Sequence, residues 1–492
     1  MRILNADRLT SHGNVAGRRA MVEILEAGLE ASNPYNNTRK FVRVEGDALV
    51  VGGDPTFEPD GSPTLGPYEY DLGRVGRIFV FGAGKGVQYS TKAIEDVLGD
   101  RLTGGCVIAK HGDEKILERV EVVFGAHPAP DEGCAAGSRR ILELCEGLRP
   151  EDLVFTVIGN GVSSLLTLPA PPVTIEDLHV VTRIMQIERG VPTGDLNFVR
   201  NSLDLMKGGR ISRHIHPARM IHIVMVDPDS YENLMHRNLW LHTLPDSTTF
   251  EGAIGILHKW DAWDAVPAVV RDYLSNADPS KETVRAEEFE SWNARIFGAM
   301  PQEYSAVRAA RRKAEGLGFR THLLSGRLSA EAKEAGLVVA GIAVSSERLG
   351  EPFEPPCALF STGELLVTVG RESGVGGRNQ EYALAAALRI AGSENVVIGG
   401  VDTDGTDGPG SQYTGCELPC LTGGIVDGQT MAEARAKGVD VVGSIKRHDT
   451  TPALWALDSG IHATQNISVG DLNVTLILGR ATAKDDGSGS VR

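Results

Sequence analysis

Short apolar runs alternate with glycine turns and helical patterns along much of the chain. Residues 77–81 form an apolar run that enters Gly82-Ala83-Gly84-Lys85, and similar β-rich runs occupy 105–109, 120–124, 153–158 and 221–226. Stretches with helical spacing, such as 138–146, lie between these runs. This alternation predicts an α/β fold in which helices cover both faces of a parallel sheet.

The remaining pattern predicts a second α/β unit. A helix is expected over 16–31, ending at Asn33-Pro34, and a hairpin-like stretch over 41–51. Polar residues 276–290 indicate a linker, and a basic amphipathic helix with a solvated face follows over 303–317. Further strands are predicted at 321–324, 357–360, 365–369, 396–399 and 474–478. We therefore expect domains over 1–280 and 281–482, with a disordered tail over 483–492.

Composition narrows the class of protein. The 492 residues are 41% hydrophobic and 23% charged, as in globular enzymes, and the formal net charge is −16. This charge argues against nucleic-acid and membrane-surface partners, since both are polyanionic. The first residues do not resemble a signal peptide, no apolar run is long enough to span a membrane, and the six cysteines are scattered. These features predict a cytoplasmic protein.

Two glycine turns in the first half follow apolar strands. Gly82, Gly84 and Lys85 could present backbone N–H groups and a charge to phosphate, although the spacing matches neither a Walker loop nor G-x-G-x-x-G. Gly159-Asn160-Gly161-Val162-Ser163 forms a comparable turn. A plain strand-to-helix turn remains the alternative for both.

Positive charge gathers between residues 197 and 210. Asn197, Arg200 and the segment Lys207-Gly208-Gly209-Arg210 place several cationic groups around a glycine pair. In an acidic chain, this concentration suits a carboxylate or phosphate ligand. A helix end with its usual lysine and glycine is the alternative.

Two further motifs lie in the second half. Gly377 opens a helix whose first turn carries Arg378, Asn379 and Glu381, and Glu364 ends an apolar run nearby. A structural loop needs no such group of polar side chains. The segment 402–408 follows another strand, and its carboxylates Asp404 and Asp407 could hold Mg²⁺ or accept a proton, although an Asp/Gly turn would look similar.

Together these motifs resemble the MOFRL-type glycerate 2-kinases, often labelled hydroxypyruvate reductases. The likeness spans most of the chain, and its most specific parts are the 197–210 block, Gly377-Arg378-Asn379-Gln380-Glu381 and Asp404-Gly405-Thr406-Asp407-Gly408. The resemblance implies a Rossmann-like N-terminal domain, a C-terminal MOFRL domain, and transfer of phosphate from ATP, with Mg²⁺, to the 2-hydroxyl of D-glycerate.

The resemblance also suggests roles for the residues. By matching position, Lys85 and Arg378 become charge-stabilising catalytic residues. The turns at Gly82, Gly84, Gly159, Asn160, Gly161 and Ser163 are expected to bind ATP phosphates. Expected contacts to the hydroxy acid come from Asn197, Arg200, Lys207, Glu364, Asn379 and Glu381, and the expected metal ligands are Asp404 and Asp407.

Four segments depart from the family's loop sequences, namely 159–164, 241–244, 362–367 and 466–472. These changes suggest a different acceptor, such as a four-carbon aldonate, or weakened use of nucleotide. A non-catalytic metabolite-binding or regulatory relative is one alternative. A nicotinamide-dependent hydroxypyruvate reductase is another, but it would need the G-x-G-x-x-G turn. A homodimer is left open.

Overall fold

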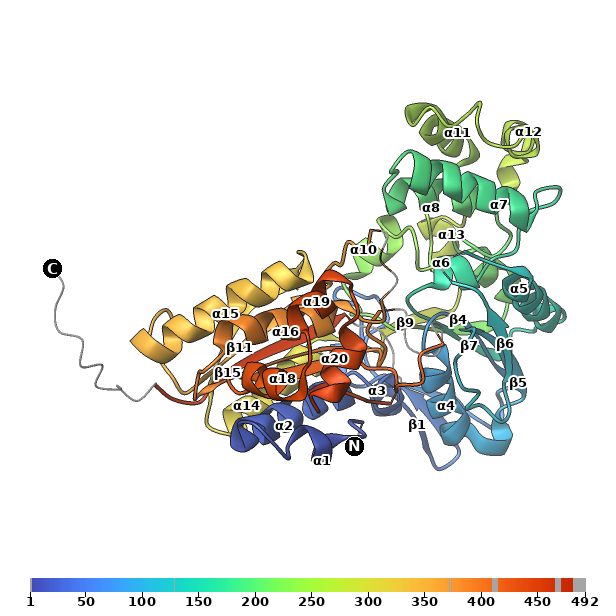
Figure 1. The fold of residues 1–492 in the computed structure, drawn as a ribbon. Coiled ribbons are helices and arrows are strands. Elements are labelled where there is room, and N and C mark those ends of the chain that lie inside the picture. Colours follow the sequence, from blue (N-terminus) through green and yellow to red (C-terminus); the bar gives the residue numbers. More distant parts are fainter. Residues whose placement is uncertain are drawn as a thin grey trace, which may run out of the picture. The chain divides into compact units, whose positions relative to one another are not determined.

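The computed structural model describes residues 2–127, 129–370, 372, 374–408, 415–464 and 470–480. The chain divides into two compact units (Figure 1). We call Pro34–Gln302 the parallel-sheet unit, and Met1–Asn33 together with Glu303–Arg492 the mixed-sheet unit. The predicted tail over 483–492 lies outside the described residues.

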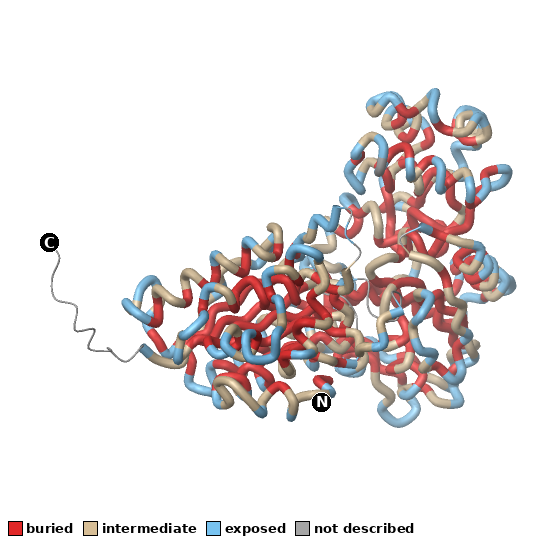
Figure 2. The backbone as a smooth tube through the Cα atoms, in the orientation of Figure 1, coloured by how far each residue is buried: buried red, intermediate tan, exposed pale blue. Residues whose placement is uncertain are grey.

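Six parallel strands form the centre of the parallel-sheet unit. Their order is β6-β5-β4-β7-β8-β9, with bounds Ile78–Ala83 (β4), Gly104–Lys110 (β5), Glu121–Gly125 (β6), Leu153–Ile158 (β7), Arg219–Val224 (β8) and Ala294–Gly298 (β9). Every residue of β4 and β7 is buried, as the continuous apolar runs predict (Figure 2). The strand order reverses between β4 and β7. In open α/β sheets, ligands bind at the carboxyl ends of the strands on either side of such a reversal.

Helices cover this sheet, and a small antiparallel sheet accompanies it. The small sheet consists of β1 (Val42–Glu45), β2 (Ala48–Val51) and β3 (Tyr68–Asp71). The longer helices are α3 (Pro34–Phe41), α4 (Val87–Leu98), α5 (Glu132–Cys145), α7 (Ile175–Thr182), α8 (Thr193–Ser202), α11 (Phe250–Lys259) and α12 (Ala268–Asn276). Short helical segments are η1 (Pro55–Phe57), η2 (Gly99–Arg101), α6 (Val162–Leu165), the π-helical η3 (Arg183–Glu188), α9 (Arg210–Ile215), α10 (Tyr231–His236), η4 (Pro279–Lys281) and α13 (Ala286–Glu290). Helices α7, α8, α11 and α12 share an apolar core of their own.

The mixed-sheet unit has three layers. Its central sheet runs in the order β10-β11-β15-β12-β13-β14, and only β10 and β11 are parallel. The strands are β10 (Arg320–Leu328), β11 (Cys357–Gly363), β12 (Val396–Asp402), β13 (Gly423–Asp427), β14 (Gly460–Ile461) and β15 (Asp471–Ile477). The helices are α1 (Ala6–Leu9), α2 (Val15–Ala31), α14 (Ala306–Gly316), α15 (Ala332–Leu349), α16 (Arg378–Ile390), α18 (Thr430–Lys437), α19 (Val441–Lys446) and α20 (Thr450–Ala456), and the short η5 (Gln302–Tyr304) precedes α14.

Period-2 burial in the strands separates the two helical layers. Leu359 packs in the core shared with α15 and α16, whereas its neighbours Ala358 and Phe360 pack in the core shared with α2 and α14. The expected α/β class is therefore confirmed, with a parallel sheet in one unit and a separate sheet in the other. In the described part of the chain, no helix is long and apolar enough to cross a membrane.

The observed division differs from the expected ranges 1–280 and 281–482. The predicted helix over 16–31 is present as α2, but its apolar face packs on β12, β15 and α14, so it belongs to the mixed-sheet unit. Residues 276–290 are not a linker, because Val284 and Phe289 are buried in the core of the parallel-sheet unit. That unit continues through β9, which the sequence pattern did not reveal. The basic face of α14 is solvated as expected, with Arg308 and Arg312 exposed, and its alanine face is buried.

One predicted strand is absent. Residues 365–369 form only an isolated bridge, Glu331–Leu366. The segment alternates in burial but hydrogen-bonds elsewhere: the Leu365 backbone N–H donates to the Asp471 carboxylate at 2.7 Å. Apolar alternation that pairs with a neighbouring backbone at a single bridge does not make a strand.

Candidate functional site

Two glycine turns meet at the carboxyl ends of β4 and β7. The Lys85 backbone N–H donates to the carbonyl of Asn160 at 2.8 Å. Gly84 has φ +140°, and a Cβ there would lie 2.7 Å from the Gly159 nitrogen, so only glycine fits. Gly161 has φ +82°, and a Cβ there would lie 2.9 Å from the His127 ring. The two turns predicted from sequence are thus one structure, at the reversal of strand order.

Cationic side chains surround His127 beside these turns. Burial, and then the charges of Lys85, Lys110 and Arg200, lower the pKa of His127 to about 4. The imidazole is therefore neutral at physiological pH, within a group of positive charges that an anion would stabilise.

Arg200 and Lys85 are cations without a carboxylate partner among the described residues. The Arg200 guanidinium donates to the Thr182 hydroxyl at 3.1 Å, and burial lowers its pKa to about 10. A buried guanidinium is normally paired. One turn away on α8, Asn197 is 3% exposed, and its Oδ1 has no hydrogen-bond partner within the described structure. Both side chains can therefore bind a ligand.

Lys207, in contrast, already has its partners. Its Nζ donates to the Asp204 carboxylate at 2.6 Å and to the Thr167 hydroxyl at 2.7 Å, and the residue is 1% exposed. Asp204 also accepts from the backbone N–H groups of Leu168 and Met206 at 3.0 and 2.8 Å. Lys207 therefore holds the loop in place, and its charge reaches the site only through space. The sequence motif did not distinguish these two roles.

Arg378 occupies a carboxylate-rich position in the mixed-sheet unit. Its guanidinium donates to Asp471 at 2.7 Å, to Asp402 at 2.8 Å and to Glu364 at 3.4 Å. Burial opposes ionisation, but the charges of Asp402 and Asp471 outweigh it and raise the pKa of Arg378. Burial, and then the charge of Asp404, raise the pKa of Asp402 well above its usual range. The arginine is permanently charged and fixed in direction.

Asp407 caps the helix that Arg378 opens. Its two carboxylate oxygens accept from the backbone N–H groups of Asn379 at 3.1 Å and Gln380 at 2.9 Å. The Asn379 side chain donates to Asp471 at 2.7 Å. Burial raises the pKa of Asp407 to about 7 despite these hydrogen bonds. Asp407 therefore positions the start of α16.

The remaining predicted residues of this region are placed as follows. Glu381 is buried and accepts from His448 Nδ1 at 2.6 Å. Asp404 is partly exposed, and its Oδ1 accepts from the Thr406 backbone N–H at 2.7 Å. Among the residues that the structure describes, no group of three His, Cys, Asp or Glu side chains is arranged to hold a metal ion.

The four segments that depart from the family sequence meet in pairs. Ser163, from 159–164, lies with its Oγ 3.0 Å from Nε2 of His242, from 241–244. Leu365, from 362–367, bonds Asp471, from 466–472, although residues 466–469 of that segment lie outside the described part. His242 and Asp471 were not selected from the sequence, because each is a lone polar residue without a local motif.

Comparison with known proteins identifies two family models and several glycerate kinases that are similar to this chain. Residues 20–275 match the family model described as a domain of unknown function, DUF4147, and residues 357–468 match the MOFRL family. The chain is 32% identical over 440 residues to the glycerate 2-kinase of Pyrococcus horikoshii, covering 89% of this chain and 92% of that protein. It is 31% identical over 408 residues to the D-glycerate 2-kinase of Thermotoga maritima, covering 82% and 91%. The crystal structure of a glycerate kinase from Thermotoga maritima is similar with a TM-score of 0.72 and 27% identity, covering 94% and 99%.

Proposed function

Because the chain belongs to the MOFRL-type glycerate 2-kinase family, we propose that it is a kinase that uses ATP to phosphorylate a small hydroxy acid. The expected substrate is D-glycerate, converted to 2-phosphoglycerate, or a close analogue with four carbons.

The observation that carries this proposal is the group of cations at the reversal of strand order. Lys85 and Arg200 have no carboxylate partner in the described structure, although the chain has a formal net charge of −16. Phosphoryl transfer requires positioning of the reactants and neutralisation of the negative charge on the transferring group, more than covalent chemistry. A site with uncompensated positive charge and glycine turns suits that task.

Within this proposal the residues divide by chemistry. The turns at Gly82, Gly84, Gly159, Asn160, Gly161 and Ser163 would receive the phosphates of ATP, with Lys85 stabilising the charge that develops on the transferring group. Asn197 and Arg200 would bind the carboxylate and hydroxyls of the acid, and Lys207 would support them through the loop.

Arg378 is the second proposed catalytic residue. Its charge is oriented by Asp471 and Asp402, and Glu364, Asn379 and Glu381 are its proposed neighbours in substrate binding. Mg²⁺ enters the proposal as the ion that accompanies the phosphates of ATP and neutralises their charge. Asp404 has a partly exposed carboxylate that could contribute to its binding, whereas Asp407 fits poorly because both of its oxygens are engaged by α16.

The four-carbon acid is favoured by one specific observation. Both contacts between altered segments, Ser163 with His242 and Leu365 with Asp471, lie beside proposed substrate residues. Coupled changes at two such places are expected when the acceptor changes size or hydroxyl pattern.

A coupled assay of ADP release tests the proposal. ATP and Mg²⁺ would be supplied with D-glycerate and with three- to five-carbon hydroxy acids. Turnover should be lost in Lys85→Ala and kept in Lys92→Ala, a lysine on α4 that pairs with Asp96 at 2.6 Å. Clear preference for glycerate over tetronates would remove the four-carbon substrate. No turnover with any acid, from folded protein, would favour a binding or regulatory role.

A further inference from the structure

Ser163 and His242 form a hydrogen-bonded pair at the edge of the proposed site. The Ser163 hydroxyl lies 3.0 Å from His242 Nε2. Ser163 is partly exposed, whereas His242 is 1% exposed. The carbonyl of His242 accepts from the Gly209 backbone N–H at 2.9 Å, which fixes the main chain behind the ring.

The surroundings of His242 determine where its single proton resides. Burial, and then the charges of Lys207 and Arg200, lower the pKa of His242 well below its usual value, so the ring is neutral and carries one N–H. Its Nδ1 is buried and has no hydrogen-bond partner in the described structure. A buried N–H without an acceptor is rarer in proteins than a buried lone pair without a donor, and nearby cations also favour a lone pair. The proton therefore belongs on Nε2, which donates to Ser163 Oγ.

This tautomer determines what Ser163 can do. A serine oxygen that accepts an N–H keeps its own O–H for another acceptor. No carbonyl or carboxylate among the described residues accepts from the Ser163 hydroxyl. The hydroxyl follows directly after the turn at Gly161, whose Cβ position lies 3.6 Å from Cγ of Lys85. Its hydrogen is therefore available close to the turn at Gly161, which adjoins Lys85.

We propose that His242 is a positioning residue that holds Ser163 as an O–H donor to an anionic group of the ligand. The group is a carboxylate of the acid or a phosphate of the nucleotide, since both accept such a hydrogen bond. The inference rests on the proposed function and goes beyond it, because it gives a role to a histidine in a segment where this chain departs from its family.

The first measurement is the tautomer itself. Nitrogen-15 NMR of the wild-type protein should show a proton on Nε2 of His242 across the neutral pH range. A proton on Nδ1 would overturn the proposal. This measurement needs neither turnover nor a variant that folds.

The second measurement is a double-mutant cycle on the Michaelis constants. Ser163→Ala and His242→Leu should each raise KM for the same ligand by about tenfold, the size expected when one hydrogen bond to a charged group is lost. The double variant should be no worse than either single variant, because His242 acts through Ser163. His242→Gln, which keeps an N–H donor, should recover most of the affinity.

The two Michaelis constants show whether Ser163 donates to the carboxylate of the acid or to a phosphate of ATP. A rise in KM for the acid identifies the carboxylate, and a rise in KM for ATP identifies the phosphate. Independent, multiplicative effects of the two substitutions, or unchanged KM for both ligands, would refute the positioning role. If the wild type turns over no acid, the proposed function fails by itself. In that case the affinity for inorganic phosphate tests the pair. If His242 acts through Ser163, Ser163→Ala and His242→Leu should weaken phosphate binding equally.

Discussion

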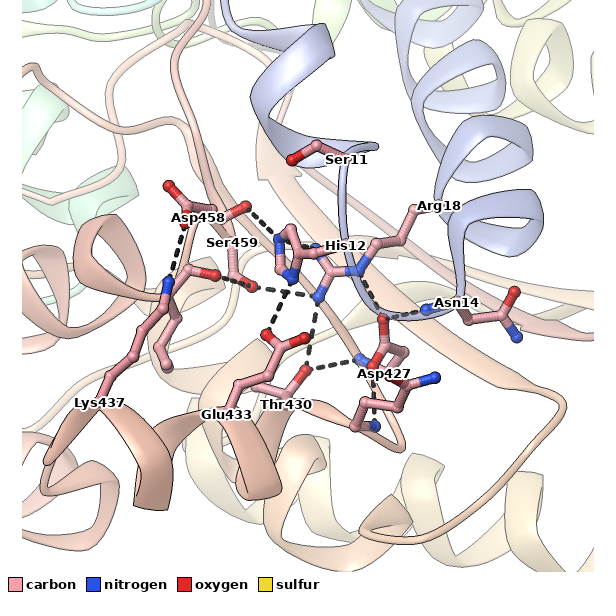
Figure 3. A network of polar contacts seen from close by, with 12 residues as sticks. Ser11, His12, Asn14, Arg18, Asp427, Thr430, Glu433, Lys437, Asp458 and Ser459 are labelled. Carbon is pink, nitrogen blue, oxygen red and sulfur yellow. Dashed lines mark hydrogen bonds and ion pairs between the residues drawn. The ribbon is translucent and has the colours of Figure 1, made fainter.

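Arg18 and Asp427 form an ion pair that is fully excluded from solvent, with Nε and Oδ2 at 2.5 Å (Figure 3). Arg18 lies on α2 and Asp427 ends β13, so the pair joins the first helices to the far end of the sequence. The pair has further partners: the Asn14 backbone N–H donates to the same Asp427 oxygen, Oδ2, at 3.0 Å, and the Arg18 guanidinium donates to the Ser459 hydroxyl at 3.2 Å. This network explains why residues 1–33 belong to the mixed-sheet unit.

Replacing Arg18 with methionine should destabilise the mixed-sheet unit. The variant leaves the Asp427 charge buried without its partner, and breaking such a pair costs about 3–5 kcal/mol in the free energy of unfolding. Urea unfolding measures the change. Arg19→Met is the matched control, since the neighbouring arginine is exposed and should change the stability by less than about 0.5 kcal/mol. Equal losses in the two variants would contradict the role of the ion pair.

Substitution of Lys207 and of Arg200, two cations from the same sequence block, should have opposite effects: one should lower stability and the other should raise KM. Lys207→Met leaves Asp204 buried and unpaired, so the free energy of unfolding should fall by about 3–5 kcal/mol. Arg200→Met removes a buried charge that has no carboxylate partner in the described structure, so stability should hold while KM for the acid rises about tenfold or more. Urea unfolding and steady-state kinetics on both variants separate the roles. A stable Lys207→Met with raised KM would assign lysine to the substrate instead.

The different roles of Lys207 and Arg200 could not be predicted from the sequence. The glycine turns at Gly84 and Gly161 were recognisable because positive φ and close backbone approach leave a local signature. The positive charge of Lys207 was equally visible, but whether a charge meets a ligand or a buried carboxylate depends on tertiary packing. Asp204, three residues earlier in the chain, gave no sign that it would become its partner.

The domain boundaries also could not be predicted from the sequence, because they too depend on tertiary packing. The helical spacing of α2 showed that one face is apolar but not which sheet covers it. The contact of Met21 and Leu25 with the core around Val397 and Leu476 is a long-range packing choice. His242 and Asp471 were missed because their chemistry arises only when two distant loops meet.

The stability of the parallel-sheet unit should depend on His127 in acid. Its pKa is about 4 in the folded protein, below the ordinary value of 6.5 in the unfolded chain. The stability is therefore full above pH 6.5 and is lost as the pH falls towards 4, by about 1.4 kcal/mol per pH unit, because the unfolded state binds the proton first. Urea unfolding at several pH values measures the unfolding free energy of the wild type and of His127→Asn. The contributions of the carboxylates cancel in the difference between the two proteins, which leaves that of His127.

Anion binding gives a second readout of the same residue. Inorganic phosphate near Lys85 and Arg200 would offset their charges, so the pKa of His127, followed by NMR, should rise in its presence. An unchanged pKa at saturating phosphate would place the anion elsewhere.

Asp407 should give the mixed-sheet unit the opposite pH dependence. Burial raises its pKa to about 7, above the ordinary value of 3.8. Its contribution to stability is therefore fully present below pH 3.8 and is lost as the pH rises to about 7, because the unfolded chain ionises first. Asp407→Asn cannot ionise, so the unfolding free energy of the wild type relative to this variant should fall by about 1.4 kcal/mol per pH unit between roughly pH 4 and 7. Urea unfolding measures the slope, which does not depend on whether asparagine caps α16 as well as aspartate does. A flat difference would mean that the N–H groups of Asn379 and Gln380 stabilise the ionised carboxylate enough to cancel the effect of burial.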